Sequence, residues 1–377
     1  MPVALLCLVA LAPPADPTAQ PVPPPLAPSV APPVVVPADP APQDPATAPL
    51  PPPTVLKDGV RAWGDLPFRR AGGELLKMDL VLPPAEADAD PTPLLVFVHG
   101  GGWVAGTKLR YKPQALEAAR RGSAAAAIQY RLSRVGPGGT YVAAFPAALE
   151  DVRAALAFLV DRAEELNVDP ARVALIGDSA GGHLSLLAAL SANGDPPDAE
   201  GDPGANTNPP ATGDTADAPA AAPPRTPVAA VVNLFGVTDM PAYYTGSRHA
   251  RTVLSLLLAG HLRDRAAAYD AASPVRYVDA DDPPVLTLHG TADPVVPFDQ
   301  AERLHAALRE AGTPNELIAV EGGTHGLFRQ RASVRDAIVR FLDEQFAPAA
   351  GTPGDGPNAA APDAAAADPG GRGGVAP

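Results

Sequence analysis

Short apolar runs alternate with longer helical patterns through the middle of the chain. The apolar runs cover residues 94–99, 124–130, 173–177, 228–235, 284–289 and 316–320. Such runs are typical of strands in a parallel sheet that is covered on both faces. Apolar residues recur at helical spacing between them, in segments 113–121, 146–166, 180–192, 300–311 and 334–346. This alternation predicts an α/β fold with a doubly wound, mostly parallel sheet.

Two further segments modify this plan. Residues 59–82 have the alternation of an antiparallel hairpin, which we expect at the edge of the sheet. Residues 239–274 predict a helical excursion, centred on 250–265, before the next strand. No repeat with a period of 20–50 residues is visible, which excludes solenoids and propellers.

Three segments rich in Pro, Ala, Gly and Asp lie outside this pattern: 1–55, 193–226 and 347–377. They contain most of the 50 prolines and most of the net charge of −14. Segments of this composition bury too little apolar surface to offset the entropy lost on ordering. We therefore expect disorder in all three, and a single folded domain over 56–346 that is interrupted by the insertion at 193–226.

The composition also limits partners and cofactors. An acidic chain without a basic stripe is not expected to bind nucleic acid or anionic membranes. Its single cysteine, Cys7, excludes an internal disulfide and a cysteine-based zinc site. No His, Asp and Glu residues have metal-ligand spacing, so neither a metal nor an organic cofactor is expected. The sequence does not indicate an oligomeric state.

The first residues suggest a targeting signal. The apolar run at 3–12 is too short to span a bilayer but has the length of a secretory signal core. No Lys or Arg precedes it, and a proline follows the candidate cleavage site. Export to the periplasm or the medium is expected, with a cytoplasmic location as the alternative.

The strongest chemical signal is GDSAGG at 177–182, directly after the apolar run VALIG and before a helical pattern. A Gly-x-Ser-x-Gly at a strand-to-helix turn is a nucleophile elbow, in which small residues allow the backbone to turn sharply. Ser179 would then be exposed at the carboxyl edge of the sheet, at the N-terminus of the next helix. The alternative is an ordinary glycine-rich turn.

A second glycine-rich turn, HGGGW at 99–103, follows the apolar run LLVFV. Three glycines at a strand end can direct backbone N–H groups toward one point, as an oxyanion requires. No Lys-Ser or Lys-Thr pair follows the glycines, which excludes a P-loop. We expect His99 to have a structural role.

Asp293 and His325 complete the candidate site. Each follows an apolar run, so both would lie at the same sheet edge as Ser179 if the sheet is parallel. Serine is a weak nucleophile at its free pKa; His325 could accept its proton, and Asp293 could orient the imidazole. A capping aspartate and an ordinary loop histidine are the alternatives. Asp178 is expected to structure the elbow, His289 and His183 to be packed in the interior, and the other histidines to lie on helix surfaces.

These motifs make the chain resemble serine esterases of the α/β-hydrolase fold, in the hormone-sensitive-lipase-like and acetyl xylan/feruloyl esterase-like group. The matching stretches are HGGGWVAGTK (99–108), YRLS (130–133), FPAALEDVRAALAFL (145–159), GDSAGGHLSLLAAL (177–190), SPVRYVDADDPPVLTLHGTADPVVP (273–297) and GGTHGLF (322–328). The resemblance implies a catalytic triad of Ser179, Asp293 and His325. It also implies an oxyanion hole formed by the N–H groups of Gly101, Gly102 and Ala180. Residues 56–93, which precede the strand LLVFV, are predicted to form a hairpin and not the N-terminal cap helices of many lipase-like relatives, so we expect little or no cap domain.

The expected activity is hydrolysis of carboxylic esters through an acyl-enzyme. A thin cap favours short acyl groups or esters linked to a polysaccharide. An amidase or peptidase of the same fold, similar to kynurenine formamidase or prolyl oligopeptidase, is the alternative. A non-catalytic binding module is disfavoured because all three triad residue types are present.

Overall fold

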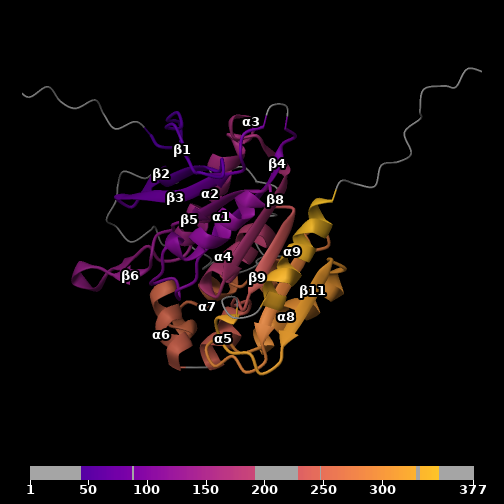
Figure 1. Ribbon diagram of the computed structural model, residues 1–377. Helices are drawn as coiled ribbons and strands as arrows, with labels where there is room; N and C mark the ends of the chain where they lie inside the picture. Colours follow the sequence, from indigo (N-terminus) through magenta and orange to yellow (C-terminus); the bar gives the residue numbers. More distant parts are fainter. Residues whose placement is uncertain (1–43, 87–88, 192–227, 247, 328–331, 348–377) are drawn as a thin grey trace, which may run out of the picture. The chain divides into compact units, whose positions relative to one another are not determined.

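A nine-stranded sheet with the strand order β1-β2-β3-β5-β4-β8-β9-β10-β11 organises the chain (Figure 1). The computed structural model describes residues 44–86, 89–191, 228–246, 248–327 and 332–347. The strands of this sheet are β1 (Thr54–Val55), β2 (Arg61–Ala71), β3 (Glu74–Leu82), β4 (Thr92–Val98), β5 (Ala124–Ile128), β8 (Val168–Asp178), β9 (Ala230–Leu234), β10 (Val285–Gly290) and β11 (Asn315–Val320). All pairs from β5 to β11 are parallel, whereas β1, β2 and β3 join antiparallel at one edge. The predicted mostly parallel sheet with an edge hairpin is confirmed.

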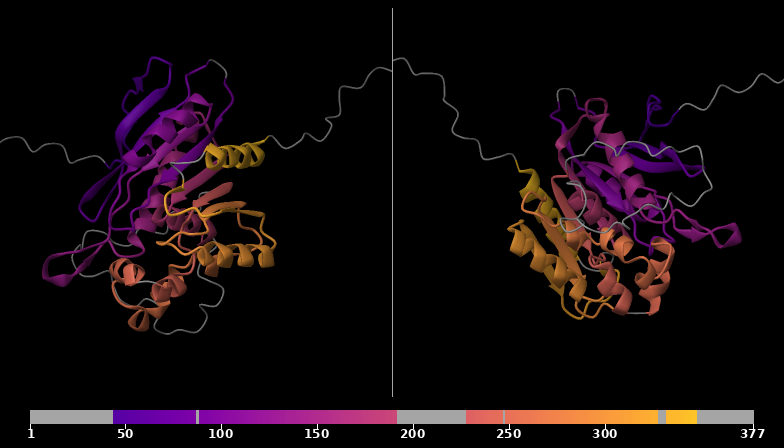
Figure 2. Two further views of the ribbon diagram at one scale, coloured as in Figure 1. Left: turned by 60° about the horizontal axis from the view of Figure 1, so that its bottom comes forward. Right: turned by 180° about the vertical axis from the view of Figure 1, so that it is seen from behind.

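Helices cover both faces of the sheet (Figure 2). They are α1 (Lys112–Arg120), α2 (Ala147–Val160), α3 (Ala163–Leu166), α4 (Ala180–Leu190), α5 (Met240–Gly246), α6 (Arg248–Leu257), α7 (Ala266–Ala271), α8 (Asp299–Ala311) and α9 (Ala332–Phe346). Short 3-10 turns cover Lys108–Tyr111, Pro137–Gly139, Leu262–Asp264 and Pro274–Tyr277, and a ribbon pairs β6 (Arg134–Val135) with β7 (Tyr141–Val142). Apolar residues of α1 and α9 join the core on one face, and those of α2, α4 and α8 join the core on the other.

The two cores explain why the strands are apolar throughout. Along β4, Leu94, Val96 and Val98 belong to one core, and Leu95 and Phe97 belong to the other. Successive side chains of a strand point to opposite faces, so a strand covered on both sides needs apolar residues at every position.

The N-terminal boundary of the folded part differs from the prediction of disorder up to residue 55. Residues 44–55 include β1, which pairs with β2, and Leu50, which packs against a core. The indole of Trp63 donates to the carbonyl of Pro51 at 2.6 Å, and Arg162 donates to the carbonyl of Ala46 at 2.6 Å. Proline-rich backbone leaves its carbonyl groups free, so side-chain donors can anchor a segment that has no apolar periodicity.

The other segments predicted to be disordered lie outside the described residues, almost in full. This applies to residues 1–43, which include the candidate signal at 3–12, to 192–227 and to 348–377. Within the described ranges, no helix is long and apolar enough to cross a membrane.

Two helical segments are more broken than predicted. The expected helix over 146–166 is divided into α2 and α3 at Arg162, whose backbone leaves the helical region (φ −110°, ψ 19°). The Arg162 guanidinium lies over the ring of Phe158, 3.9 Å from its centroid, and also binds Ala46. The excursion after β9 contains α5, α6 and α7 rather than one helix over 250–265.

Candidate active site

The backbone at Ser179 makes the sharp turn expected of a nucleophile elbow. Ser179 lies between β8 and α4 with φ 52° and ψ −120°, a conformation that costs energy for a residue with a side chain. A Cβ on Gly177 would lie 2.2 Å from the carbonyl oxygen of Gly181, and a Cβ on Gly181 would lie 2.1 Å from that of Val98. Only glycine fits at either position. The N–H of Ser179 donates to the carbonyl of Leu234 in β9 at 2.8 Å, which ties the turn to the next strand.

The N-terminus of α4 lies directly behind Ser179. Its first turn closes where the N–H of His183 donates to the carbonyl of Ser179 at 3.0 Å. The N–H of Ala180 precedes that bond, so it has no partner within the helix. The positive end of the helix dipole is therefore directed toward the serine side chain.

Asp293 and His325 form a hydrogen-bonded pair at the same sheet edge. Nδ1 of His325 lies 2.7 Å from Oδ2 of Asp293. The other carboxylate oxygen, Oδ1, accepts from the N–H groups of Val295 at 2.8 Å and Val296 at 3.1 Å. Burial alone would raise the pKa of Asp293, but hydrogen bonds from His289, His325 and the backbone outweigh it and hold this pKa well below its usual value. The carboxylate is therefore ionised at neutral pH and can stabilise an imidazolium.

The loops that carry this pair are joined to each other. The N–H of Ala292 donates to the carbonyl of Gly323 at 3.0 Å, and the N–H of Gly322 donates to the hydroxyl of Thr291 at 2.9 Å. A Cβ on Gly290 would lie 2.2 Å from the carbonyl oxygen of Gly323. This close approach of the chain after β10 to the chain after β11 brings an aspartate and a histidine 32 positions apart into contact.

Phe235 contacts the candidate catalytic histidine at the end of β9. Its ring centroid is 4.6 Å from that of His325, and it directly follows Leu234, whose carbonyl accepts from the N–H of Ser179. Among the described residues, no hydrogen bond joins the Ser179 hydroxyl to His325. Proton transfer between them therefore requires the hydroxyl and the imidazole to come within hydrogen-bond distance.

The HGGGW turn has the conformation that only glycines adopt readily. Gly101 has φ 131° and Gly102 has φ 60°, and a Cβ on Gly101 would lie 2.1 Å from the carbonyl oxygen of Ala105. Within the described part of the chain, the N–H groups of Gly101 and Gly102 donate no hydrogen bond. They are available for an external acceptor, as an oxyanion hole requires.

Asp178 ties this turn to the elbow. Its Oδ1 accepts from the N–H of Gly100 at 2.9 Å and from the hydroxyl of Tyr111 at 2.8 Å, and its Oδ2 pairs with Arg110 at 2.5 Å. Burial and the charge of Asp178 raise the pKa of Tyr111 well above its usual value, so the phenol remains a donor. The residue beside the serine has the structural role that the sequence predicts.

Two histidines near the site are structural, as predicted. His99 is buried, and its ring stacks on Tyr130 with 4.3 Å between centroids. Burial lowers the pKa of His99. His183 lies between the indole N–H of Trp103, 3.1 Å from its Nδ1, and the carbonyl of Ala272, 2.8 Å from its Nε2. Burial lowers the pKa of His183 to about 4, so both rings are neutral at physiological pH.

The helical excursion after β9 lines the site. Val253 of α6 would be 3.7 Å from a Cβ on Gly102. Tyr243 of α5 is buried, and its burial together with the charge of Asp293 raises its pKa to about 12. The sequence identified this excursion without connecting it to the site.

The sequence also predicted that His289 is packed in the interior. His289 is indeed buried, and its Nε2 lies 3.4 Å from Oδ2 of Asp293.

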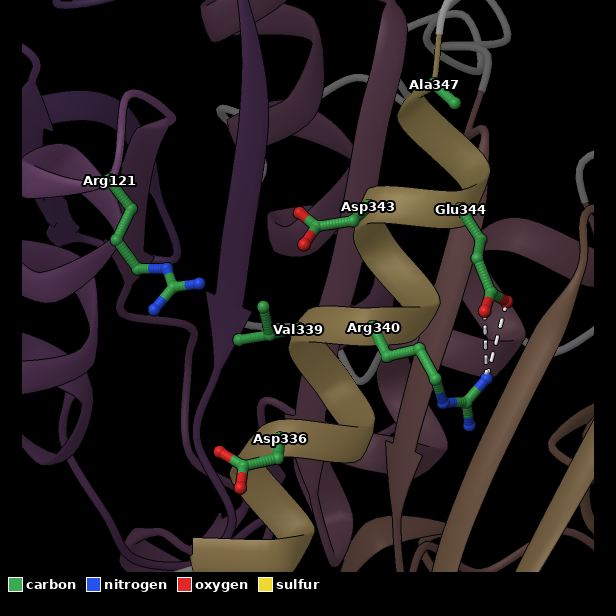
Figure 3. Close-up of a pocket in the computed structure, with 7 residues that line it drawn as sticks. All are labelled: Arg121, Asp336, Val339, Arg340, Asp343, Glu344 and Ala347. Atoms are coloured by element: carbon green, nitrogen blue, oxygen red, sulfur yellow. Dashed lines mark hydrogen bonds and ion pairs between the residues drawn. The ribbon is translucent and has the colours of Figure 1, made fainter.

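A separate surface groove of about 570 Å³ contains none of these residues (Figure 3). Asp336, Val339, Asp343 and Glu344 of α9 line it, opposite Arg121 at the end of α1. Among the described residues, no His, Cys, Asp and Glu side chains cluster closely enough to hold a metal ion.

Two family models match the chain. The BD-FAE model matches residues 78–308, which include Ser179 and Asp293, and the TAP-like protein model matches residues 265–354, which include Asp293 and His325. Among curated proteins, the chain is 32% identical to esterase LipQ of Mycobacterium tuberculosis over 75% of its length and 61% of that protein. It is 33% identical to a probable carboxylic ester hydrolase, LipM, of the same organism, over 67% of its length and 53% of that protein.

Solved structures share the architecture. A thermophilic esterase of Thermogutta terrifontis aligns with a TM-score of 0.57 and 25% identity, over 76% of this chain and 92% of that one. A truncated carbohydrate esterase from gut microbiota aligns with a TM-score of 0.59 and 25% identity, over 78% of this chain and 99% of that one. The curated relatives are longer, and the alignments span 53–61% of LipQ and LipM. Since the BD-FAE model matches more than half of the chain, the protein belongs to the BD-FAE family and has the α/β-hydrolase fold.

Proposed function

We propose that this protein is a serine hydrolase that cleaves carboxylic esters through an acyl-enzyme. The observation that carries the proposal is the 2.7 Å pair of His325 and Asp293 at the sheet edge that also carries the strained elbow of Ser179. The curated relatives support it, since LipQ is named an esterase and LipM a probable carboxylic ester hydrolase. No step needs a metal or an organic cofactor.

In the proposed mechanism, the Ser179 hydroxyl attacks the ester carbonyl carbon while Nε2 of His325 accepts its proton. Asp293 holds the imidazole in the tautomer that carries hydrogen on Nδ1 and stabilises the imidazolium. The N–H groups of Gly101, Gly102 and Ala180 stabilise the tetrahedral oxyanion. His325 returns the proton to the leaving alcohol, and it then activates the water that releases the acid from Ser179.

The proposed substrates are esters with short acyl groups, including acyl groups linked to a polysaccharide. The proximity of Val253 to Gly102 supports a short acyl chain, because α6 restricts the space beside the candidate oxyanion donors. The Thermogutta esterase has structures with propionate and butyrate bound, and another structural relative is a carbohydrate esterase. A chain-length series of p-nitrophenyl esters with its maximum at long chains would contradict this preference.

The decisive experiment compares Ser179→Ala with Ser185→Ala. Ser179 directly precedes α4, and Ser185 lies within the same helix. Ser185 is buried, and its hydroxyl has no hydrogen-bond partner among the described residues. We expect Ser179→Ala to lower kcat by roughly 10⁴- to 10⁶-fold and Ser185→Ala to retain activity. A fluorophosphonate should label the protein and the Ser185 variant at residue 179 only. Unchanged turnover in Ser179→Ala would exclude the mechanism.

Assays of an ester and its matched amide separate esterase from amidase. Faster turnover of the amide would favour the amidase alternative. We further propose export, on the sole basis of the apolar run at 3–12. N-terminal sequencing of the protein from the native host tests this, because a retained Met1 would contradict signal cleavage.

A further inference from the structure

A second imidazole lies beside the candidate catalytic carboxylate. His289 is at the end of β10 and is completely buried. Its Nε2 is 2.9 Å from the carbonyl oxygen of Val296 and 3.4 Å from Oδ2 of Asp293. Both neighbours are acceptors, because a carbonyl has no hydrogen and the carboxylate is ionised. Nε2 of His289 must therefore carry a hydrogen.

That N–H closes the turn which holds the carboxylate. Oδ1 of Asp293 accepts from the N–H groups of Val295 and Val296, and the carbonyl of the same Val296 accepts from His289. Oδ2 lies between Nδ1 of His325 at 2.7 Å and Nε2 of His289 at 3.4 Å. The carboxylate is thus held by two backbone donors on one oxygen, and by a histidine on each side of the other.

Packing alone does not account for a histidine at this position. Nδ1 of His289 is buried and has no hydrogen-bond partner among the described residues. The rings of Phe298, 5.6 Å away between centroids, and Phe235, 6.5 Å away, meet it edge to face. An unpaired buried acceptor destabilises the folded state, and an apolar side chain at this position would avoid that destabilisation. The Nε2–H group, which donates to the Val296 carbonyl, is the feature of His289 that an apolar side chain could not supply.

We propose that His289 is a positioning residue for the Asp293–His325 pair, fixing the carboxylate through the Val296 carbonyl and through Oδ2. This inference rests on the proposed function, in which the same pair activates Ser179. It assigns His289 no contact with substrate. Its contribution is the orientation of Asp293, and through Asp293 the orientation of the His325 imidazole.

A matched pair of variants separates positioning from packing. His289→Gln keeps an N–H donor near the position of Nε2, whereas His289→Met has a similar length and shape but no donor. We expect His289→Met to lower kcat by roughly 10- to 100-fold with little change in KM, because misorientation of the imidazole affects the reaction step. His289→Gln should retain most of the kcat of the unmodified protein. His305→Met is the control. The prediction that His305 lies on a helix surface is wrong, because it is buried on α8, where it pairs with Asn315 and not with the Asp293 turn.

Nuclear magnetic resonance gives a readout that does not depend on activity. Nitrogen shifts of the unmodified protein should show His289 as the Nε2–H tautomer. The resonance of the low-field proton between His325 and Asp293 should be displaced or lost in His289→Met and preserved in His289→Gln.

Equal activity of His289→Met and His289→Gln, with that proton resonance unchanged in both, would overturn the proposal. So would an Nδ1–H tautomer in the unmodified protein, a result that needs no variant to fold. If the unmodified protein hydrolyses no ester, the proposed function fails, while the tautomer and the low-field proton still decide the role of His289.

Discussion

Replacement of Asp178 by asparagine tests whether the candidate oxyanion loop is held in place by the residue beside the nucleophile. Asp178 is 2% exposed and binds Gly100, Tyr111 and Arg110, and it directly precedes Ser179, the proposed nucleophile. Asparagine preserves the shape and one acceptor oxygen. It removes the charge and places an amide NH₂ or a neutral oxygen opposite the Arg110 guanidinium.

The structure sets the expected magnitude. Hydrogen bonds to a charged group contribute about 1.5–3 kcal/mol, compared with about 0.5–1.5 kcal/mol for neutral ones. Two such bonds, from Gly100 and Tyr111, therefore lose about 1 kcal/mol each on neutralisation. The Arg110 pair adds less than about 1 kcal/mol because a third of its side chain is exposed, and relief of the buried charge offsets part of the loss. We expect the free energy of unfolding to fall by about 2 kcal/mol.

The loosened loop should also slow the reaction. Removal of a single oxyanion donor costs roughly 10²- to 10³-fold in kcat, so a displaced donor should cost roughly 10- to 100-fold with little effect on KM. Urea unfolding and steady-state kinetics on a short-chain ester measure both effects. Asp169→Asn is the control, because Asp169 pairs with Arg172 at the surface and should change stability by less than about 1 kcal/mol. An Asp178→Asn variant with the stability and kcat of the unmodified protein would refute the reasoning.

Two further predictions follow from backbone strain and from a buried acid. Gly101→Ala should lower kcat at least about 100-fold in steady-state assays on a short-chain ester, because its Cβ would lie 2.1 Å from the Ala105 carbonyl oxygen. Gly73→Ala is the control and should retain activity, because Gly73 also has a positive φ but a Cβ there would meet open space. Burial and the charges of Asp279 and Asp281 raise the pKa of Asp282 to about 7 from 3.8, so the folded state binds a proton that the unfolded state releases. The free energy of unfolding should therefore fall by at most about 4 kcal/mol as pH rises from 4 to 7. Thermal melts over this pH range should show a falling melting temperature for the unmodified protein and not for Asp282→Asn. The same dependence of melting temperature on pH in both proteins would contradict the prediction.

The sequence identified the parallel strands because burial on both faces demands apolar residues at every position, as in β4. It also placed Ser179, Asp293 and His325 at strand ends, where parallel strands share one edge. The role of the glycines at 177 and 181 could be predicted from the local sequence, because the turn leaves no room for a Cβ. These features depend on periodicity and on short-range sterics, which a single sequence carries.

Contacts between segments that are distant in sequence could not be predicted from these patterns. Trp63 and Arg162 bind carbonyl groups of the proline-rich segment before β1, and backbone carbonyls have no sequence signature. The sequence also did not predict that α6 lies close to Gly102, because this proximity depends on how the segment after β9 folds back over the site.

The local pattern of residues determined the sheet, the elbow and the set of residues available for chemistry. Only the tertiary structure decided which of those residues touch. Asp178 could be assigned to the elbow from its position, but its partners Gly100 and Tyr111 come from other segments. The sequence predicted only that His289 is buried, whereas the structure shows that the turn at Asp293 places the Val296 carbonyl and the carboxylate next to its Nε2. The physical reason is that a hydrogen bond depends on distance and direction between atoms, which chain order alone does not specify.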